Sequence, residues 1–426
     1  MKNARVAAVS VVCSILQNTD NLDNLVSKTI NHLDEKDKKL FHAVVFGVFE
    51  KWYELKSIID KLLKKPLNKK DQLIQATLLC GLFELRWHRS AQYGVVSEYV
   101  NVASNSKRPW AKGFINAVLR NFARKKEFVT GSVCNIEAHW NHPRWFVEDL
   151  KKAWPEKWKS ILVANNSHPP MTIRVNLKKI DRNSYLKLLS NAGIQGDYGQ
   201  PDSSILLKKP TNIANLPGWD LGYCSIQDSS SQWVAKICAP QKNERVLDAC
   251  AAPGGKSCHL MEVNEIDLTC VDISSERLKK LSENCTRLSV NPTVIGGDAT
   301  EPETWWDHRF FDKILIDAPC SGTGVIRRNP DIRRLDSSRI DKLALRQTRL
   351  ILKLWPLLKK GGQILYTTCS VLEKENDHRV EEALQYIPAE IDNLNVIPGE
   401  KTKYGRQILP SHENDGFYFS SLVKTR

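Results

Sequence analysis

The stretch Val246-Leu-Asp-Ala-Cys-Ala-Ala-Pro-Gly-Gly-Lys-Ser257 decides the fold of the C-terminal half of this chain. Its first apolar residues indicate the end of a buried strand, and the small residues after them indicate a tight turn into a helix. Further apolar runs predict buried strands at 268–271, 294–295, 314–316 and 364–366, and helical patterns lie between them at 275–287 and 338–358. Strands that alternate with helices predict a parallel, doubly wound α/β sheet with a Rossmann-like arrangement.

The regions before this sheet have different patterns. Residues 1 to about 140 predict an all-α domain, because apolar residues recur at three- and four-residue steps in 6–16, 41–53, 71–88 and 113–122. A connector rich in tryptophan and proline follows, and then an alternating strand pattern at 171–176, a short helix at 185–189 and a turn-rich stretch at 193–204. The predicted organisation is a helical domain at 1–140, a small α+β connector at 141–225 and an α/β domain at 226–426.

Charge is distributed unevenly along the 426 residues, which carry 62 Lys and Arg against 48 Asp and Glu, a net charge of +14. Residues 1–140 carry +9, residues 141–235 carry +4 and residues 236–426 carry +1 by the same count. An apolar fraction of 42% excludes wholesale disorder and collagen-like folds. The asymmetry favours a polyanion partner bound mainly by the N-terminal part, and the alternative is a basic surface that only confers solubility.

The eleven cysteines show no C-x-x-C spacing, which favours reduced thiols in a cytoplasmic protein over a disulfide framework. Cys134, His139 and His142 lie near one another in sequence, but their loose spacing is not typical of a metal site, and we expect no metal. No apolar run approaches the ~18–20 residues of a membrane span, so we expect no membrane association.

The glycine turn permits two interpretations. A P-loop requires glycine where this chain has Cys250, which argues against an ATPase with Asp317 as its metal-binding acid. The second interpretation is a cofactor that contains adenosine and no triphosphate. Asp272, at the end of the next strand, is then placed to accept hydrogen bonds from ribose hydroxyls, and Asp298, after the third, to accept from the adenine amino group. For each acid alone, a helix cap is the alternative.

Two more strings carry chemistry, Asp317-Ala-Pro-Cys-Ser-Gly-Thr-Gly324 and Tyr366-Thr-Thr-Cys-Ser370. Cys320 and Cys369 each follow a strand candidate, in polar loops of small residues, so either thiolate is a candidate nucleophile. Spacing does not rank the two. Arginines after the first string are candidates to hold phosphates of a nucleic acid, or else form a solvated helix face; they are Arg327, Arg328, Arg333, Arg334 and Arg339.

Together with Ala251-Ala-Pro-Gly-Gly-Lys256 and Asp415-Gly-Phe-Tyr-Phe419, these strings resemble the signature of the Nop/Sun family of RNA cytosine-5 methyltransferases. The N-terminal string Ala111-Lys-Gly-Phe-Ile-Asn-Ala-Val-Leu-Arg120 resembles the helical NusB-like RNA-binding domain. The combination is typical of the bacterial Sun-type branch, which acts on small-subunit (16S) ribosomal RNA. The resemblance covers essentially the whole chain and implies a monomeric enzyme.

The resemblance also implies roles for individual residues. S-adenosyl-L-methionine is the implied cofactor, with Asp272 and Asp298 on its ribose and adenine and Asp317 between cofactor and base. Cys369 is the implied nucleophile toward carbon 6 of cytosine, and Cys320 the implied assistant in product release. A raised pKa is expected for Asp317, which would then stabilise the covalent intermediate. The backbone that cradles the methionine part is Cys250, Ala251, Ala252, Pro253, Gly254, Gly255 and Lys256.

One further class remains open at this point. A non-catalytic RNA-binding factor built on the helical domain would account for the basic N-terminal half. It would leave the paired cysteines and the three acids at strand ends unexplained.

Overall fold

The computed structural model describes residues 3–17, 21–68, 70–88, 90–104, 108, 110–125 and 135–425. The chain divides into two compact units, Met1–Lys152 with Ile326–Leu335 and Ala153–Val325 with Asp336–Arg426. Cys134 lies outside the described residues. Within the described ranges, no helix is long and apolar enough to cross a membrane.

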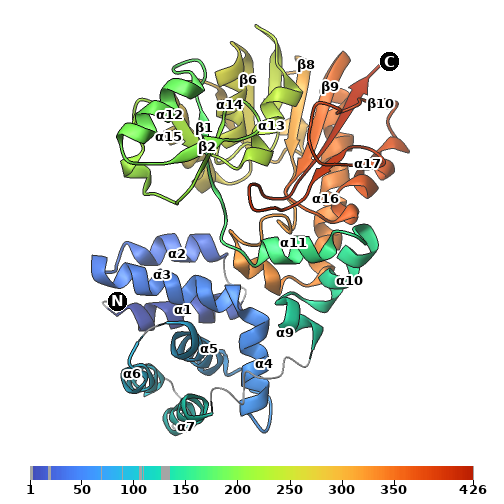
Figure 1. The fold of residues 1–426 in the computed structure, drawn as a ribbon. Coiled ribbons are helices and arrows are strands. Elements are labelled where there is room, and N and C mark those ends of the chain that lie inside the picture. The colour runs from blue at the N-terminus through green and yellow to red at the C-terminus, as the bar shows by residue number, and fades with distance from the viewer. Residues whose placement is uncertain are drawn as a thin grey trace. The chain divides into compact units, whose positions relative to one another are not determined.

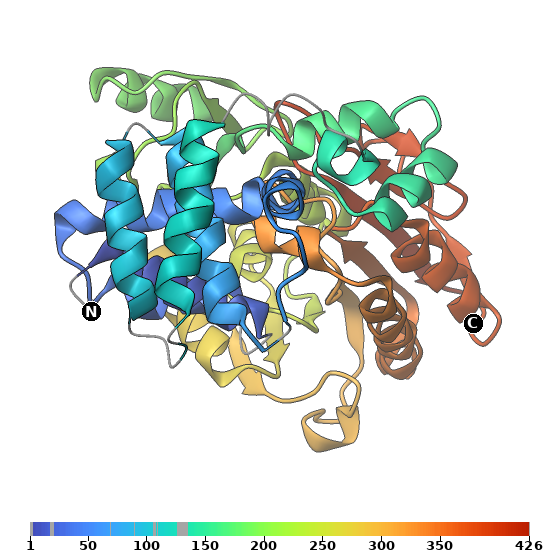
Figure 2. The same cartoon turned by 90° about the horizontal axis from the view of Figure 1, so that it is seen from below.

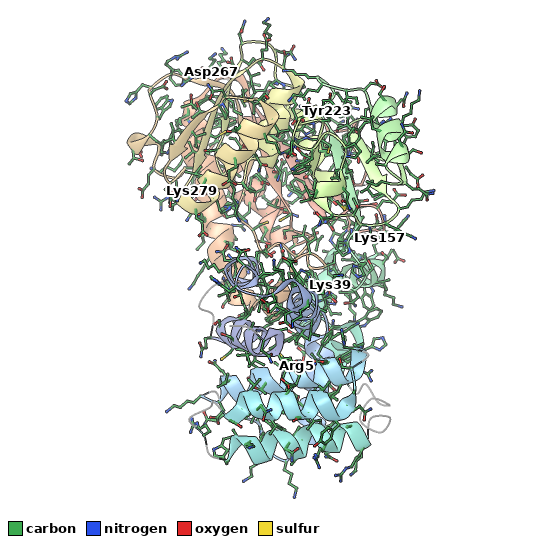
Figure 3. All side chains as sticks on the ribbon, turned by 90° about the vertical axis from the view of Figure 1, so that its left-hand side faces the viewer. Arg5, Lys39, Lys157, Tyr223, Asp267 and Lys279 are labelled. Atoms are coloured by element: carbon green, nitrogen blue, oxygen red, sulfur yellow. The ribbon has the colours of Figure 1, made fainter. Side chains whose placement is uncertain are left out.

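The first unit is helical, as the sequence predicts. Helix α5 is its centre, with an almost wholly buried surface that packs against α1, α3, α6 and α7 (Figure 1). Figure 2 shows α6 and α7 side by side, and Figure 3 labels Arg5, which pairs with the buried Glu84 at 2.6 Å. Its helices are α1 Ala4–Leu16, α2 Leu22–Ile30, α3 Glu35–Glu50, α4 Trp52–Leu62, α5 Gln72–Trp87, α6 Gln92–Ser104, α7 Ala111–Arg124, α9 Ile136–Trp140 and α10 Arg144–Ala153.

One predicted helix is interrupted. The apolar pattern of 41–53 predicts continuity, but the chain breaks between α3 and α4 at Lys51. The cause is the side chain of Asn141, which donates to the carbonyl of Glu50 and accepts from the backbone N–H of Tyr53 at 3.0 Å. A distant asparagine thus satisfies the end of one helix and the start of the next.

The segment 326–335 belongs to this helical unit and contains the short 3₁₀ helix η3 Pro330–Arg334. Arg333 is 1% exposed and donates to the carbonyl of Asn141 at 2.8 Å. Arg334 donates to the carbonyl of Ile15 at 2.8 Å, and its guanidinium lies 4.9 Å from the ring centre of Trp52. The interpretation of Arg333 as a phosphate contact or a solvated residue was therefore wrong, because its side chain is packed inside the unit.

The connector forms a small antiparallel sheet in the order β2-β3-β1-β4. One face packs on α12 through Ile173, Tyr185, Leu189 and Ile205. The predicted strand at 171–176 and helix at 185–189 are confirmed, and the turn-rich stretch 193–204 also contains β2. The elements are α11 Trp158–Asn165, β1 Met171–Val175, α12 Arg182–Asn191, β2 Gly196–Tyr198, β3 Ser204–Leu207, η1 Ile213–Asn215 and β4 Cys224–Ile226.

The larger sheet of the second unit contains the predicted strands as a parallel set in the order β9-β8-β5-β6-β7. Apolar residues alternate between its two faces, since Val246 of β5 faces the core with α13, α14 and α15, and Leu247 faces the core with α16. The elements are β5 Arg245–Asp248, β6 Asp267–Asp272, β7 Thr293–Gly296, β8 Phe311–Asp317, β9 Leu358–Thr368, α13 Ser229–Cys238, α14 Gly255–Val263, α15 Ser275–Leu288, α16 Ser337–Leu354 and α17 Asp377–Leu384, with η2 Pro302–Thr304, η4 Trp355–Leu357 and η5 Glu373–Glu375.

The sheet also has an antiparallel edge that the sequence patterns do not predict. The C-terminal strand β13 pairs with β9 in the antiparallel sense and extends the sheet through β12 and β11, while β10 pairs with β13. The run 417–422 is buried throughout, so it lacks the polar alternation that marks a one-sided strand. These strands are β10 Ala389–Ile391, β11 Glu400–Lys401, β12 Arg406–Ile408 and β13 Phe417–Lys424.

Candidate active site

The glycine turn joins β5 to α14 at the carboxyl edge of the parallel strands, where the sequence places it. Gly254 has φ +96°, and a Cβ there would lie 3.0 Å from the side chain of Leu281, so the position requires glycine. The N–H of Ala251 donates to the carbonyl of Val271 in β6 at 3.0 Å. Because its backbone is fixed to the neighbouring strand, the turn presents a preformed cradle.

Asp272 ends β6 beside this turn and is 4% exposed. Its carboxylate accepts from the N–H of Ala252 at 3.0 Å and from the N–H of Ser274 at 2.9 Å, while Arg277 lies 3.4 Å away. The alternative role of a helix cap is wrong for Asp272, because Ser274 caps α15 by accepting from the N–H of Arg277. The apolar residue after it, Ile273, is 64% exposed at the same edge.

Asp298 follows β7 and also has partners within the chain. It accepts from the N–H and hydroxyl of Thr300, both at 2.9 Å, and pairs with Arg346 at 3.1 Å. Burial opposes the charge, and the Thr300 bonds and the Arg346 guanidinium outweigh it, so the pKa of Asp298 is lowered. Asp298 is held as a carboxylate at the position expected of an acceptor.

Asp248, the last residue of β5, is an acid that sequence reasoning missed. It is 1% exposed; Oδ2 accepts from Ser257 Oγ at 2.7 Å, and Oδ1 has no hydrogen-bond partner in the part of the chain that the structure describes. Burial raises its pKa to about 7, opposed by the Ser257 bond and reinforced by the charge of Asp317. The sequence did hold a signal for Asp248, because it ends the strand before the glycine turn, just as Asp272 and Asp298 follow the next two strands.

Asp317 ends β8, and a second missed feature is its partner. Lys256 Nζ, from the glycine turn, donates to Asp317 Oδ2 at 2.7 Å, and Thr367 Oγ1 lies 3.2 Å from Oδ1. Burial opposes the charge of Lys256, but the Asp317 carboxylate outweighs it and Cys369 contributes, so the pKa of Lys256 is raised. The ammonium also lies 5.1 Å from the ring centre of Phe417.

The structure brings the two predicted cysteines together. Cys320 Sγ lies 3.4 Å from Cys369 Sγ, although the residues are 49 positions apart in sequence. The contact with Cys369 and burial raise the pKa of Cys320 well above its ordinary value. Cys320 is therefore a neutral thiol, able to donate toward its neighbour.

A buried glutamate behind the thiols connects their two loops, and sequence reasoning missed it. Glu375 is fully buried and accepts from the N–H of Ser321 at 2.8 Å, next to Cys320. It also accepts from Ser370 Oγ at 2.6 Å, next to Cys369. One carboxyl thus fixes the separation of the two loops.

The connector contacts the cofactor turn through Arg174 of β1. This arginine is 1% exposed and forms a two-pronged ion pair with Glu262 of α14, at 2.5 and 2.9 Å. Its Nη1 donates to the carbonyl of Gly255 at 2.7 Å and to Gln227 Oε1 at 2.7 Å. A side chain of the connector therefore supports the first turn of the helix that follows the cradle.

All the predicted site residues lie at one edge of the sheet, at or just beyond the ends of β5, β6, β7, β8 and β9. Within the described ranges, no group of three or more His, Cys, Asp and Glu residues is arranged to hold a metal ion.

Comparison with known proteins covers the chain from end to end. The family model of the 16S rRNA methyltransferase RsmB/F matches residues 235–423, a ferredoxin-like domain model of RsmF/B-like methyltransferases matches 142–214, and the NusB family model matches 2–124. A protein of Coxiella burnetii named probable ribosomal RNA small subunit methyltransferase B is 40% identical over 99% of both chains. The ribosomal RNA small subunit methyltransferase B of Pseudomonas putida is 38% identical over 99% of this chain and 98% of that one.

Solved structures agree with this fold. The crystal structure of PH0851 covers 99% of both chains with a TM-score of 0.80 at 20% identity. A methyltransferase homologue from Pyrococcus horikoshii covers 68% of this chain and 97% of its own, with a TM-score of 0.60 at 26% identity. A NusB-like helical domain, a ferredoxin-like connector and a methyltransferase domain, in this order and at this identity to the curated relatives, place the chain in the RsmB family of small-subunit ribosomal RNA methyltransferases.

Proposed function

We propose that the protein transfers a methyl group from S-adenosyl-L-methionine to carbon 5 of a cytosine in small-subunit ribosomal RNA, with Cys369 as the nucleophile. The observation that carries the proposal is the pair of thiols 3.4 Å apart at the strand ends. Membership of the family supports methylation of ribosomal RNA. The thiol pair supports carbon 5 of the base as the methylated position. Methylation there requires a thiolate to attack carbon 6 first.

The cofactor fits the residues of the glycine turn. The backbone of 250–256 offers the cradle, and the carboxylates of Asp272 and Asp298 offer acceptors along its edge. The unpartnered Oδ1 of Asp248, buried beneath the turn, offers a further acceptor for a cationic amino group. When bound, the cofactor supplies an electrophilic methyl group on a sulfonium.

The two cysteines have different surroundings, which supports unequal roles. Cys320 remains a thiol because its pKa is raised well above the ordinary value by the contact with Cys369 and by burial. The Lys256 ammonium has Cys369 and the Asp317 carboxylate as neighbours, and both raise its pKa. The proposal therefore keeps Cys369 as the nucleophile and gives the Cys320 thiol the role of assisting when Cys369 leaves.

The reaction then follows from these positions. Cys369 Sγ forms a bond to carbon 6, nitrogen 3 of the ring takes up a proton, and carbon 5 gains the electron density with which it would accept the methyl group that the cofactor supplies. The Lys256–Asp317 pair, with Nζ and Oδ2 2.7 Å apart, is placed to supply that proton and to hold the base. A water molecule then takes the proton from carbon 5, the electrons of that bond re-form the ring double bond, the Cys369 thiolate leaves, and nitrogen 3 returns its proton to the Lys256–Asp317 pair. The target cytosine must be unstacked for this attack.

Adduct trapping tests the assignment of the two cysteines. Cys320→Ala should accumulate a covalent RNA–protein adduct that denaturing gels resolve, and Cys369→Ala should form none. The reverse pattern would make Cys320 the nucleophile. Bisulfite mapping of ribosomal RNA from a deletion strain tests the product: one 5-methylcytosine should disappear, and an unchanged map contradicts the proposed function.

A further inference from the structure

A cavity in the second unit lies apart from the glycine turn. It has a volume of about 430 Å³. Its walls come from the connector (α11, β1, β2 and β3), from the start of α13 and from the C-terminal segment 398–414. Lys157, labelled in Figure 3, is one of the residues that line it. The volume is in the range of small-ligand sites.

Two buried hydroxyls, in residues that line this cavity, have no hydrogen-bond partner in the described part of the chain. They are Thr172 Oγ1 on β1 and Ser204 Oγ on β3, in residues that are 2% and 0% exposed. Thr172 pairs in register with Leu206, two residues beyond Ser204, so both hydroxyls face the same side of the sheet. Buried polar groups are almost always hydrogen-bonded, and a hydroxyl can both donate and accept. The pair therefore fits a ligand with both kinds of group on one edge.

The charges around the cavity disfavour a phosphate as that ligand. Among the described residues, Asp197, Glu400 and Glu413 line it with only one cation, Lys157, which pairs with Glu400. A negative group would face more carboxylates than ammonium groups. Proline, leucine and the ring of Tyr198, which is 61% exposed, complete the lining and offer apolar faces. A neutral, flat, polar-edged ligand such as a nucleobase satisfies these conditions.

The cavity wall is bonded to the loops that carry the catalytic thiols. Ser230 Oγ, at the cavity, donates to the carbonyl of Asp415 at 2.6 Å. The next residue, Gly416, donates its N–H to the carbonyl of Gly324 at 2.9 Å, and Gly324 in turn donates to the carbonyl of Cys369 at 2.9 Å. Two backbone hydrogen bonds in series therefore separate the cavity wall from the proposed nucleophile.

We propose that this cavity holds an unpaired nucleobase of the substrate RNA strand, beside the cytosine that is methylated, with Thr172 and Ser204 bonded to the edge of the base. The inference rests on the proposed function, because it takes the strand that enters the cavity to be the one that supplies the target cytosine. It gives the connector a part in choosing the substrate, in addition to its support of the cofactor turn.

The test combines a protein variant with modified RNA. The full-length Thr172→Val, Ser204→Ala double variant removes both hydroxyls with little change of volume, and Ser190→Ala, exposed on α12 of the same domain, is the matched control. Each protein is assayed for methylation of an RNA fragment around the mapped cytosine, and of fragments that carry a single abasic nucleotide at each flanking position.

For the wild type, loss of one particular flanking base should lower kcat/KM about tenfold, and the double variant should lose about tenfold on intact RNA. On that same abasic RNA the double variant should lose nothing further, because the base that the hydroxyls would bind is already missing. Melting temperature and affinity for S-adenosylhomocysteine should match the control, and if the double variant is unstable, each single variant should show part of the same effect.

Two results would overturn the proposal. The first is a double variant whose kcat/KM on intact RNA equals that of the wild type. The second is a loss of kcat/KM from the double variant that adds in full to the loss from the missing base at every abasic position. Failure of the proposed function looks different, since the wild type itself would then place no methyl group on carbon 5 of any cytosine.

Discussion

At the scale of single residues, Asp248 is the most unusual acid of the site, because it is buried with one oxygen unpartnered among the described residues. Its pKa is raised by burial to about 7 in the folded protein, against about 4 in an unfolded chain. Between these values the folded state holds a proton that the unfolded state has lost. Stability therefore falls as pH rises from about 4 to 7.

The isosteric variant Asp248→Asn should remove this dependence. Compared with the wild type, it should gain stability progressively as pH rises from about 5 to 7, by a few kcal/mol, and the gain should level off above about pH 8. Urea unfolding of both proteins across this range measures the difference. Asp267→Asn, partly exposed on β6, is the control, and a constant difference at all pH values would show that Asp248 does not titrate there.

Replacement of Lys256 gives a second prediction at the scale of single residues. Replacing it with Gln removes the ammonium beside Asp317 and Cys369 but keeps a hydrogen-bond donor. Adduct formation by Cys369 should slow by roughly one to two orders of magnitude, because the ammonium that holds the Asp317 carboxylate is removed. Single-turnover rates at saturating RNA and cofactor measure this. A normal single-turnover rate with weakened affinity alone would mean that Lys256 acts only by binding.

At the scale of helices and strands, the sequence predicts those elements whose position follows from a local pattern of residues. The parallel strands and the glycine turn were predictable because each strand is a short apolar run before a small-residue turn. The break at Lys51 and the burial of Arg333 were not, because both depend on Asn141, which no local pattern connects with them. The role of Glu375 was not predictable for the same reason, because only the fold brings it next to the loops of Cys320 and Cys369.

Replacement of Glu375, the last residue of η5, gives the first prediction at this scale. Glu375→Ala leaves several buried donors of the two cysteine loops without an acceptor and should cost about 3 kcal/mol of stability. Glu375→Gln keeps the shape and should fold, yet slow adduct formation while the affinity for S-adenosylhomocysteine stays unchanged. Circular dichroism melts and single-turnover assays separate the effects. Normal adduct formation in the glutamine variant would contradict a positioning role.

The contact between β1 and α14 is a second prediction at this scale. Arg174→Met leaves Glu262 buried without its partner and should destabilise the protein by roughly 3–5 kcal/mol. Arg174→Met combined with Glu262→Leu removes both charges and should recover most of that stability, as urea unfolding can measure. Cofactor affinity should remain weakened in the double variant, since the bond to the Gly255 carbonyl is still absent. Full recovery of that affinity would show that the turn needs no support from the connector.

At the scale of the whole molecule, we propose that RNA binds chiefly to the helical unit, because its residues 1–140 carry +9. Binding dominated by phosphates should weaken steeply with salt, with a slope of log affinity against log salt of about −0.9 per neutralised phosphate on a duplex and about −0.7 on a single strand. Helix α7 presents Lys112, Arg120 and Arg124 on its exposed side. These are the side chains whose contribution can be removed without disturbing the core.

The triple variant Lys112→Gln, Arg120→Gln, Arg124→Gln should reduce the salt slope by about 0.7–0.9 for each phosphate that is no longer neutralised, while kcat at saturating RNA stays at the wild-type value. Lys279→Gln with Lys280→Gln, on the exposed side of α15, is the matched control and should leave the slope unchanged. Filter binding of the ribosomal RNA fragment from about 50 to 300 mM salt gives the slopes. A flat salt dependence of the wild type would contradict the role of residues 1–140 as the RNA platform, and equal slopes for the triple variant and the control would move that platform away from α7.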